Sequence, residues 1–299
     1  MAAPLLLVPS DPLAPRAPDE HFAREVEAAR GGGLTVAVVD HDAVVAGELP
    51  AAVRQVPASD VARTAWYRGW MICSSAYARL GSALEARGVR LLTSPAAYAA
   101  AHELPGWYDA FAGSTPASVW SPWEPGRTPT PADVGPLLET LGGGPGVVKD
   151  YVKSRKHEWD EACYVPDLAD INTATRVVAR MVELQGDGLA GGIVVRAFEP
   201  FVTDGGRAQE VRVWWVLGAP ALVTPHPDAP AGSDADVPAG VLDAVGRNVA
   251  ALGAPFVTTD LALRADGVWR VIEVGDGQVS DLPGGQDPAP LLRALAAAG

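Results

Sequence analysis

The sequence predicts an α/β protein in which a lobe of alternating strands and helices precedes a part built largely from antiparallel strands. Short apolar runs alternate with helical patterns over the first hundred residues. Beyond them, turn signatures at 203–206 and 265–267 each join two strand-like runs, as in β-hairpins. A hydrophobic content of 48% in 299 residues is enough for one large core or two modest ones.

The first lobe is expected over residues 1–120, and a second domain over 121–299. The segment 104–130, rich in tryptophan and proline, is interpreted as a connection that covers a surface or a cleft. We expect the elements of the first lobe to be strands at 5–8, 34–39 and 89–92 and helices at 19–29 and 70–86.

The second domain is expected to begin with a helix at 131–141, which ends at the glycines of 142–146. Two hairpins follow in the prediction, and each is interrupted by polar turn residues. The expected elements are a strand from 147, a helix at 172–185, strands at 193–202 and 210–217, a helix at 241–252, and strands at 256–264 and 268–274.

The only three lysines, Lys149, Lys153 and Lys156, fall within eight residues of a chain that holds 23 Lys plus Arg. An ammonium group is a compact charge that suits phosphate oxygens. The β-branched residues after 142–146 favour a strand on which Lys149, Tyr151 and Lys153 share one face, and a helix would also align the lysines. A solvated basic face or a nucleic-acid patch is the alternative interpretation.

Composition argues against that alternative. The formal net charge is −13 and the isoelectric point is near 4.8, so long-range repulsion opposes nucleic acids and anionic membranes. The apolar run at 5–8 is too short to span a membrane and has no basic segment before it, so a cytoplasmic protein is expected. Cys73 and Cys163 lack metal-site spacing and are expected to pack as small apolar groups.

Two carboxylates form a second constellation, because Asp260 and Glu273 lie inside otherwise apolar strands of the last predicted hairpin. A buried charge without a partner is costly, so both should face a cation, an arginine or water. Side by side, they would offer the oxygen ligands that Mg²⁺ takes together with phosphate oxygens. The alternative is an ordinary ion pair with Arg264 or Arg270.

Taken in order, these motifs resemble the ATP-grasp superfamily, and their local wording resembles a little-characterised bacterial and phage branch of it. The resemblance covers about 130–290 and, more loosely, the first lobe; it implies an α+β ATP-grasp domain of two subdomains. It is carried by the lysine strand, Arg196–Val202, Glu210–Val213, Asp260 and Glu273, with Val148–Trp159, Tyr67–Met71 and Glu273–Gln278.

The resemblance implies ATP and Mg²⁺ as ligands. It makes Lys149 a fixed phosphate contact and has Lys153 or Lys156 reach the phosphates from a mobile loop, with Lys153 also a catalytic candidate. The hinge that reads adenine would be formed by Glu199, Pro200, Phe201 and Val202, through the Pro200 carbonyl and the Val202 N–H.

By the same resemblance, Glu210 would hold the ribose hydroxyls and Arg212 would approach the transferring phosphate. A cross-strand ion pair is the alternative for these two residues. Arg196 is a second candidate for an anion contact, and Arg68 for a substrate carboxylate, although an arginine at a helix entry is an equal alternative.

For the metal, the resemblance implies Asp260 and Glu273 as ligands. Where many members have Glu-x-Asn, this chain has Gly275 after Val274. The third ligand is therefore open, with Asp276 or water as candidates.

The implied activity is ATP-dependent joining of a carboxylate to an amine through an acyl phosphate, on an amino acid, a peptide or a similar small carboxylate. The alternative is an ATP-binding module, or a degenerate enzyme, without ligase turnover. The expected partners are ATP and the two small substrates, without nucleic acid or membrane. The assembly state is open, with a homodimer as one alternative.

Overall fold

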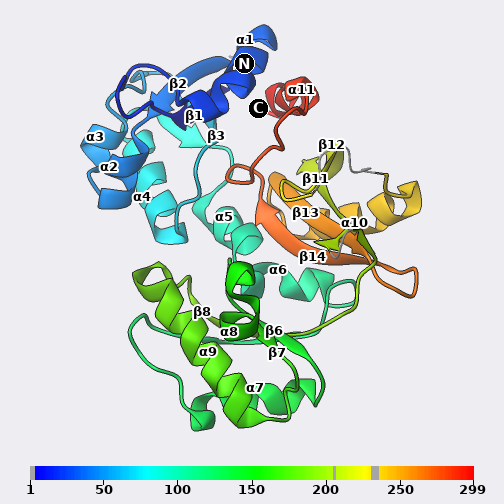
Figure 1. Ribbon diagram of the computed structural model, residues 1–299. Coiled ribbons are helices and arrows are strands. Elements are labelled where there is room, and N and C mark those ends of the chain that lie inside the picture. Colours follow the sequence, from blue (N-terminus) through cyan, green and yellow to red (C-terminus); the bar gives the residue numbers. More distant parts are fainter. Residues whose placement is uncertain (1–3, 205–206, 230–235) are drawn as a thin grey trace. The chain divides into compact units, whose positions relative to one another are not determined.

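The computed structural model describes residues 4–204, 207–229 and 236–299 (Figure 1). The chain divides into two compact units that are each discontinuous in sequence. Unit 1 comprises Met1–His102, Gln209–Leu261 and Glu273–Gly299, and unit 2 comprises Glu103–Ala208 and Ala262–Ile272. This division by contacts follows no single cut in the chain, so the predicted domain boundary at residue 120 stays a prediction.

A four-stranded sheet with the order β2-β1-β3-β4 forms the first layer of unit 1, and all of its pairings are parallel. All five residues of β1 are buried, as expected for the central strand of a sheet that is covered on both faces. The strand order reverses at β1, with β2 on one side and β3 on the other. The strands are β1 (Leu5–Pro9), β2 (Thr35–Val39), β3 (Arg63–Tyr67) and β4 (Val89–Leu91).

Alternation along β1 divides the apolar side chains between two cores. Leu5 and Leu7 face a core with Tyr77 and Leu80. Leu6 and Val8 face another, which also takes side chains from the C-terminal part of the chain. The helices of this region are η1 (Glu20–Phe22), α1 (Ala23–Gly31), α2 (His41–Ala46), α3 (Leu49–Ala52), α4 (Ser74–Glu85) and α5 (Pro95–His102).

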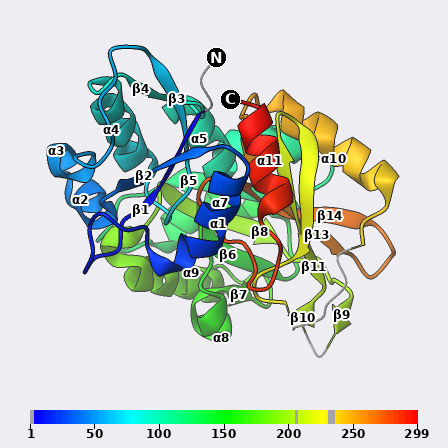
Figure 2. The same ribbon diagram turned by 90° about the horizontal axis from the view of Figure 1, so that it is seen from above.

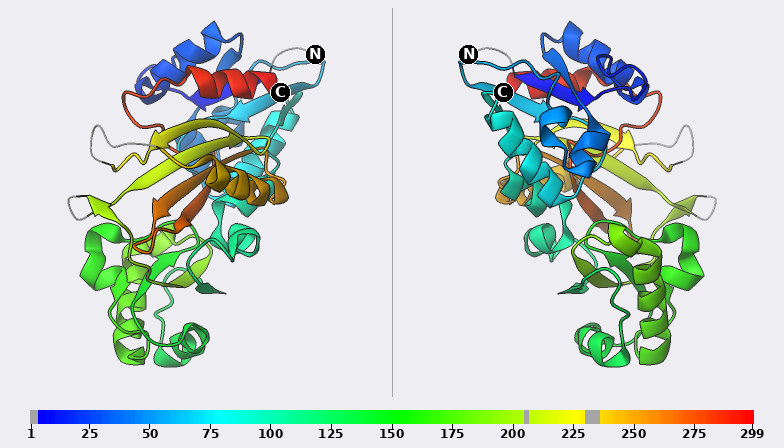
Figure 3. Two further views of the ribbon diagram at one scale, coloured as in Figure 1. Left: turned by 90° about the vertical axis from the view of Figure 1, so that its right-hand side faces the viewer. Right: turned by 90° about the vertical axis from the view of Figure 1, so that its left-hand side faces the viewer.

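A second sheet, with the order β12-β11-β13-β14, supplies most of the polar residues of interest in unit 1. Helix α11 packs against α1 and against this sheet, as Figure 2 shows. Both chain ends lie in unit 1 (Figure 3), and Gly299 lies against Pro4. The elements are β11 (Glu210–Val216), β12 (Ala219–Pro225), α10 (Ala239–Ala251), β13 (Phe256–Leu263), β14 (Trp269–Asp276) and α11 (Ala289–Ala297).

Unit 2 is built on an antiparallel sheet with the order β5-β8-β6-β7, whose core packs against two amphipathic helices. Its strands are β5 (Ser118–Pro122), β6 (Gly146–Asp150), β7 (Tyr164–Val165) and β8 (Gly192–Ala197), with a small hairpin of β9 (Thr203–Asp204) and β10 (Arg207–Ala208). Its helices are α6 (Leu104–Phe111), α7 (Pro131–Leu141), η2 (Lys156–Glu158), α8 (Trp159–Ala162), α9 (Ile171–Gln185) and η3 (Gly186–Gly188).

The fold confirms the predicted class of mixed α and β structure with antiparallel sheets. Helix α7 coincides with its predicted range, and β13 and β14 are sheet neighbours as predicted. The hairpin of 193–202 with 210–217 is wrong, because β8 and β11 belong to different sheets. Of its expected turn, residues 205–206 lie outside the described residues. The segment 104–130 is not only a connection, since it contains α6 and β5.

Candidate functional site

Unit 1 contains a buried ion pair that joins two neighbouring strands. Arg212 of β11 donates from Nε to Oδ1 of Asp260 on β13 at 2.8 Å, and from Nη2 to Oδ2 at 2.9 Å. The Asp260 residue is only 5% exposed. Burial by itself lowers the pKa of Arg212, but the charge of Asp260 and its hydrogen bonds raise that pKa above the usual value. The cross-strand ion pair that the sequence left open as an alternative is therefore present.

His226 joins this pair, and sequence reasoning missed it. It follows β12 directly, and its Nε2 lies 3.5 Å from Oδ2 of Asp260 and 4.0 Å from Oε2 of Glu210. Only the pairing of β11 with β12 brings it beside these carboxylates. The one sequence signal was a histidine at the end of an apolar run. We call Glu210, Arg212, His226 and Asp260 the unit 1 cluster.

Glu273 belongs to the same electrostatic group, since its charge contributes to the raised pKa of Arg212. It lies on β14, the neighbour of β13. Two carboxylates on adjacent strands fit a Mg²⁺ ion that takes its other oxygen ligands from phosphates and water. Among the described residues, no three His, Cys, Asp or Glu side chains gather closely enough to hold a metal alone.

Asp276 does not fit the role of third metal ligand. The residue is 0% exposed, and its Oδ1 accepts hydrogen bonds from the backbone N–H and from Nε2 of Gln278 at 2.9 and 3.1 Å. Burial raises the pKa of Asp276 to about 7, which the hydrogen bonds from Gln278 oppose. The side chain therefore belongs to the interior of unit 1.

Gly275 explains why the asparagine of Glu-x-Asn is missing. A Cβ atom at this position would lie 3.0 Å from Oγ1 of Thr258 and 3.3 Å from Oγ of Ser280, which are themselves hydrogen bonded at 2.6 Å. Two paired hydroxyl groups thus occupy the space next to residue 275, so an asparagine could enter only if they moved.

Arg68 is also part of the interior, contrary to its tentative assignment to a substrate. Its residue is 1% exposed and donates from Nε and Nη2 to the carboxylate of Glu25 at 2.6 and 2.9 Å. Nη1 donates to the carbonyl of Gln278, and the guanidinium lies over the rings of Phe22 and Trp214. A group surrounded in this way presents no face to a substrate carboxylate.

In unit 2, the lysine segment leaves the strand earlier than predicted. Lys149 lies within β6 opposite Val194 and is only 6% exposed. The strand ends at Asp150, so Lys153 does not share its face. Lys153 and Lys156 are exposed on the segment that follows. The sequence prediction overlooked Asp150 as a turn residue.

Asp150 stops the strand by capturing the chain that leaves it. Its Oδ1 accepts from the N–H groups of Val152 and Lys153 at 2.7 and 2.5 Å. Its Oδ2 accepts from Nε2 of Gln185 and from the N–H of Ala190 at 2.7 and 3.2 Å. One buried carboxylate therefore sets where the segment with the exposed lysines begins.

The thiol of Cys163 reports on the same cations. Burial raises its pKa to about 11, while the charges of Lys149 and Lys156 act in the opposite direction. Both ammonium groups therefore lie near this buried thiol. The raised pKa keeps Cys163 neutral at pH 7, in agreement with its expected role as a small packing group.

The predicted adenine hinge differs from expectation in its hydrogen bonds. The Val202 N–H donates to the carbonyl of Leu263 at 2.8 Å, and the Pro200 carbonyl accepts from the N–H of Ala265 at 2.9 Å. Phe201 forms a β-bridge with Arg264. The Val202 N–H is thus already used within unit 2, so we do not retain it as a donor to adenine.

Glu199 and Arg196 also have partners within unit 2. Arg270 binds the Glu199 carboxylate through Nε and Nη2, both at 2.9 Å, and Arg264 approaches it at 3.2 Å. Arg196 donates to Oγ of Ser118 at 3.0 Å and to the carbonyl of Ile272. These bonds hold the end of β8 in place, which is a structural role.

Three aromatic side chains gather near the lysine segment, and sequence reasoning did not single them out as a group. The rings of Trp159 and Tyr164 are stacked, with centroids 5.3 Å apart, and Phe198 meets both edge-on at 6.4 and 5.6 Å. Trp159 and Phe198 are partly exposed. The group lies in unit 2 beside η2, which begins at Lys156.

Comparison with solved structures shows a shared fold. D-cycloserine synthetase DcsG is 20% identical, with a TM-score of 0.62 and coverage of 98% of both chains. The ATP-grasp ligase PsnB, in complex with a minimal precursor, Mg and ADP, is 16% identical with a TM-score of 0.57 over 98% of this chain and 97% of that one. D-alanine–D-alanine ligase from Bacillus anthracis, complexed with ATP, is 12% identical with a TM-score of 0.58 over 99% and 96%.

No curated protein matches the sequence. In the part of the chain that the structure describes, no helix combines the length and apolarity needed to cross a membrane. The profile of an ATP-grasp domain family, the third family of its clade, matches residues 140–295, more than half of the chain. This range includes the lysine segment, the unit 1 cluster and Glu273, and the chain therefore belongs to this family of ATP-grasp domains.

Proposed function

We propose that this chain is an ATP-dependent ligase that joins a carboxylate to an amine and forms ADP. The observation that carries the proposal is the buried pair of Arg212 and Asp260, with Glu273 beside it, in a member of the ATP-grasp superfamily. The solved relatives of the same fold are ligases and synthetases, some of them bound to ADP, ATP or a precursor peptide. An amino acid or peptide carboxylate is accordingly the substrate class we propose.

The ion pair can exchange partners without leaving a buried charge unpaired. Asp260 and Glu273 would hold Mg²⁺, which would supply neutralisation of the charge on the phosphates. Arg212, released from Asp260, would then bind a phosphate oxygen, since its fork of donors matches phosphate as well as carboxylate. Because each charge gains a new opposite charge, the exchange avoids the cost of an isolated buried ion.

The lysines of unit 2 would serve as the other cations. Lys149, buried in β6, would give a fixed phosphate contact, and Lys153 and Lys156 would bind after the segment beyond Asp150 rearranges. Glu210 would accept hydrogen bonds from ribose hydroxyls, with His226 beside it as a further polar group.

The reaction needs no nucleophile from the protein. An oxygen of the substrate carboxylate attacks the terminal phosphorus of ATP and the bond to ADP breaks, which forms an acyl phosphate. The lone pair of the amine then attacks the acyl carbon, the bond to phosphate breaks, and the nitrogen loses a proton to solvent. Arg212 would stabilise negative charge that develops during these steps.

Nucleotide binding is tested by thermal unfolding with and without MgATP. At a hundredfold excess over Kd, MgATP should stabilise the wild type by about 2.7 kcal/mol. We expect this stabilisation to fall sharply in Lys149→Met and Glu273→Gln. The matched controls Arg176→Met and Glu139→Gln alter exposed residues of the same charge and should keep it. Equal stabilisation of all five proteins would refute the site.

Turnover separates the ligase from the alternative, an ATP-binding protein without activity. The crowded position of Gly275 and the burial of Asp276, which leave two protein carboxylates for the metal, favour considering that alternative. Release of ADP and phosphate that requires both an added carboxylate and an added amine, with the amide identified by mass spectrometry, supports the ligase. ADP release that ignores both substrates contradicts it.

A further inference from the structure

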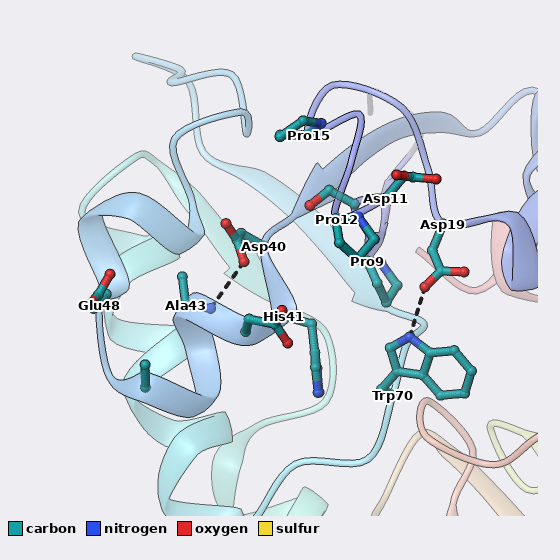
Figure 4. Close-up of a pocket in the computed structure, with 13 residues that line it drawn as sticks. Pro9, Asp11, Pro12, Pro15, Asp19, Asp40, His41, Ala43, Glu48 and Trp70 are labelled. Atoms are coloured by element: carbon teal, nitrogen blue, oxygen red, sulfur yellow. Dashed lines mark hydrogen bonds between the residues drawn. The ribbon is translucent and has the colours of Figure 1, made fainter.

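Unit 1 contains a cavity of about 340 Å³ that no residue of the unit 1 cluster lines. It lies at the carboxyl ends of β1 and β2, and it includes Trp70, which follows β3 (Figure 4). The strand order of this parallel sheet reverses at β1, and ligands of open α/β sheets bind outside the carboxyl ends of the strands at such a reversal. A volume of this size suits a small organic molecule.

The charge of the lining selects the kind of molecule. Among the described residues, the cavity is lined by five carboxylates and by no lysine or arginine. One wall is the indole of Trp70, which is 38% exposed and is held by a hydrogen bond from its Nε1 to Oδ2 of Asp19 at 3.1 Å (Figure 4). Carboxylates beside an exposed aromatic ring are the groups that attract an organic ammonium ion. The five carboxylates belong to Asp11, Asp19, Asp40, Asp42 and Glu48.

A metal ion fits the cavity less well than an ammonium group. Within the described ranges of the chain, no three acidic, histidine or cysteine side chains converge as metal ligands. The carboxylates of Asp11 and Asp40 also accept hydrogen bonds from nearby backbone N–H groups, those of Leu13 and Ala43 respectively. The carboxylates therefore create a negative field over the cavity without forming a chelating site.

His41 adds a polar group of a different kind. Its Nδ1 is buried and has no hydrogen-bond partner among the residues described. Burial lowers the pKa of His41 against the raising effects of Asp42, Asp40 and Asp19, so a neutral ring is favoured at pH 7. A neutral imidazole has one nitrogen that can accept a hydrogen bond from an N–H donor.

The cavity is connected to the unit 1 cluster by a chain of direct contacts. The ring of Trp70 lies 4.5 Å from that of His21, and Nε2 of His21 lies 2.8 Å from Oδ1 of Asp281. The carbonyl of Asp281 accepts a hydrogen bond from Nη1 of Arg212 at 3.1 Å. One residue pair therefore separates the cavity wall from the arginine to which we assign phosphate binding.

From these observations we infer that the cavity binds the amine substrate, as a small molecule that carries at least one ammonium group. The inference rests on the proposed function for the fate of the ligand, because only a ligase would use this amine as its nucleophile. Binding itself depends on the cavity alone and needs neither ATP nor turnover.

The test is a calorimetric titration of the full chain with 1,4-diaminobutane in the absence of nucleotide. We expect binding of the diamine, and none of 1,4-butanediol or succinate, which have similar lengths but no positive charge. In a protein labelled with ¹⁵N in its indole groups, the Trp70 resonance, assigned through Trp70→Phe, should shift with the diamine.

The variant Asp42→Asn/Glu48→Gln removes two exposed carboxylates of the lining that form no side-chain hydrogen bond or ion pair with another described residue. We expect it to weaken diamine binding by about fivefold to tenfold. The pair Glu27→Gln/Glu139→Gln changes the net charge equally at exposed positions outside the cavity and should bind as the wild type does.

Three outcomes would overturn the inference: no diamine binding, equal weakening in both double variants, or a preference for Mg²⁺ or succinate. The result is independent of the nucleotide test, which contains no amine. Diamine binding without ATP stabilisation would remove the proposed function and leave the cavity as an amine site. The reverse result would remove only the cavity.

Discussion

At the scale of single residues, charges inside apolar strands mark the parts of the chain that carry chemistry. Asp260 was singled out because a carboxylate in such a strand must have a partner, and the structure supplies Arg212. The same reasoning applied to Asp276 leads elsewhere, since this residue lies fully inside unit 1 with Gln278. Sequence pattern therefore identifies buried carboxylates but not what each one faces.

The pair of Arg212 and Asp260 gives the first prediction. Asp260→Asn should lower the free energy of unfolding by about 3 kcal/mol, because it leaves a buried guanidinium without its opposite charge. Arg212→Met/Asp260→Leu removes both charges and should recover most of that loss, yet neither protein should be stabilised by MgATP. Urea unfolding and thermal shifts measure both effects. A double variant that is less stable than Asp260→Asn would contradict this account.

Asp276 gives a prediction about pH. Its pKa is raised to about 7 in the folded protein, so the folded state holds a proton that the unfolded state releases near pH ~4. The contribution to stability is present at low pH and is lost as pH rises toward 7, by up to about 1.4 kcal/mol per pH unit. Asp276→Asn should flatten the profile of unfolding free energy between about pH 5 and 8. The exposed control Asp243→Asn should retain the wild-type profile.

At the scale of elements, the end of β6 decides how the three lysines are presented. Sequence alone placed them on one strand face or one helix face, and either would align their charges. Asp150 instead ends the strand after Lys149 and turns the chain, so one lysine is buried and two are exposed. The different environments support different roles for the three ammonium groups.

Asp150 can be tested directly. Asp150→Ala removes a carboxylate that accepts four hydrogen bonds and should lower the free energy of unfolding by about 3 kcal/mol. It should also reduce the stabilisation by MgATP, because the segment with Lys153 would no longer begin in a defined turn. Asp187→Ala, an exposed change in the same unit, should do neither. Denaturant titrations with and without MgATP provide the measurement.

At the scale of the whole molecule, unit 1 combines parts of the chain that are far apart in sequence. Its second core packs Leu6, Val8 and Trp66 from the start of the chain with Trp214, Phe256 and Leu291 from much later. A cut at residue 120, as the sequence suggests, would separate these apolar side chains. The first 120 residues would then expose the face of β1 that Leu6 and Val8 cover.

The fragment 1–120 is therefore expected not to fold on its own. Expressed alone, it should bind a hydrophobic dye and show little cooperative unfolding, whereas co-expression with 121–299 should restore a soluble complex. Circular dichroism during heating and dye fluorescence measure both. A fragment that unfolds cooperatively without its complement would support the sequence-based domain boundary instead.

The sequence by itself determined the class of fold, the positions of most helices, the superfamily and the set of charged residues at issue. These features are local, because periodicity, turn residues and motif order can be read within short windows. Only the tertiary structure decided that Arg68 and Asp276 are interior groups, that His226 stands beside Asp260, and that carboxylates from separate loops surround one cavity. The reason is that burial and charge pairing depend on strand neighbours and on packing across long sequence separations, which no local pattern encodes.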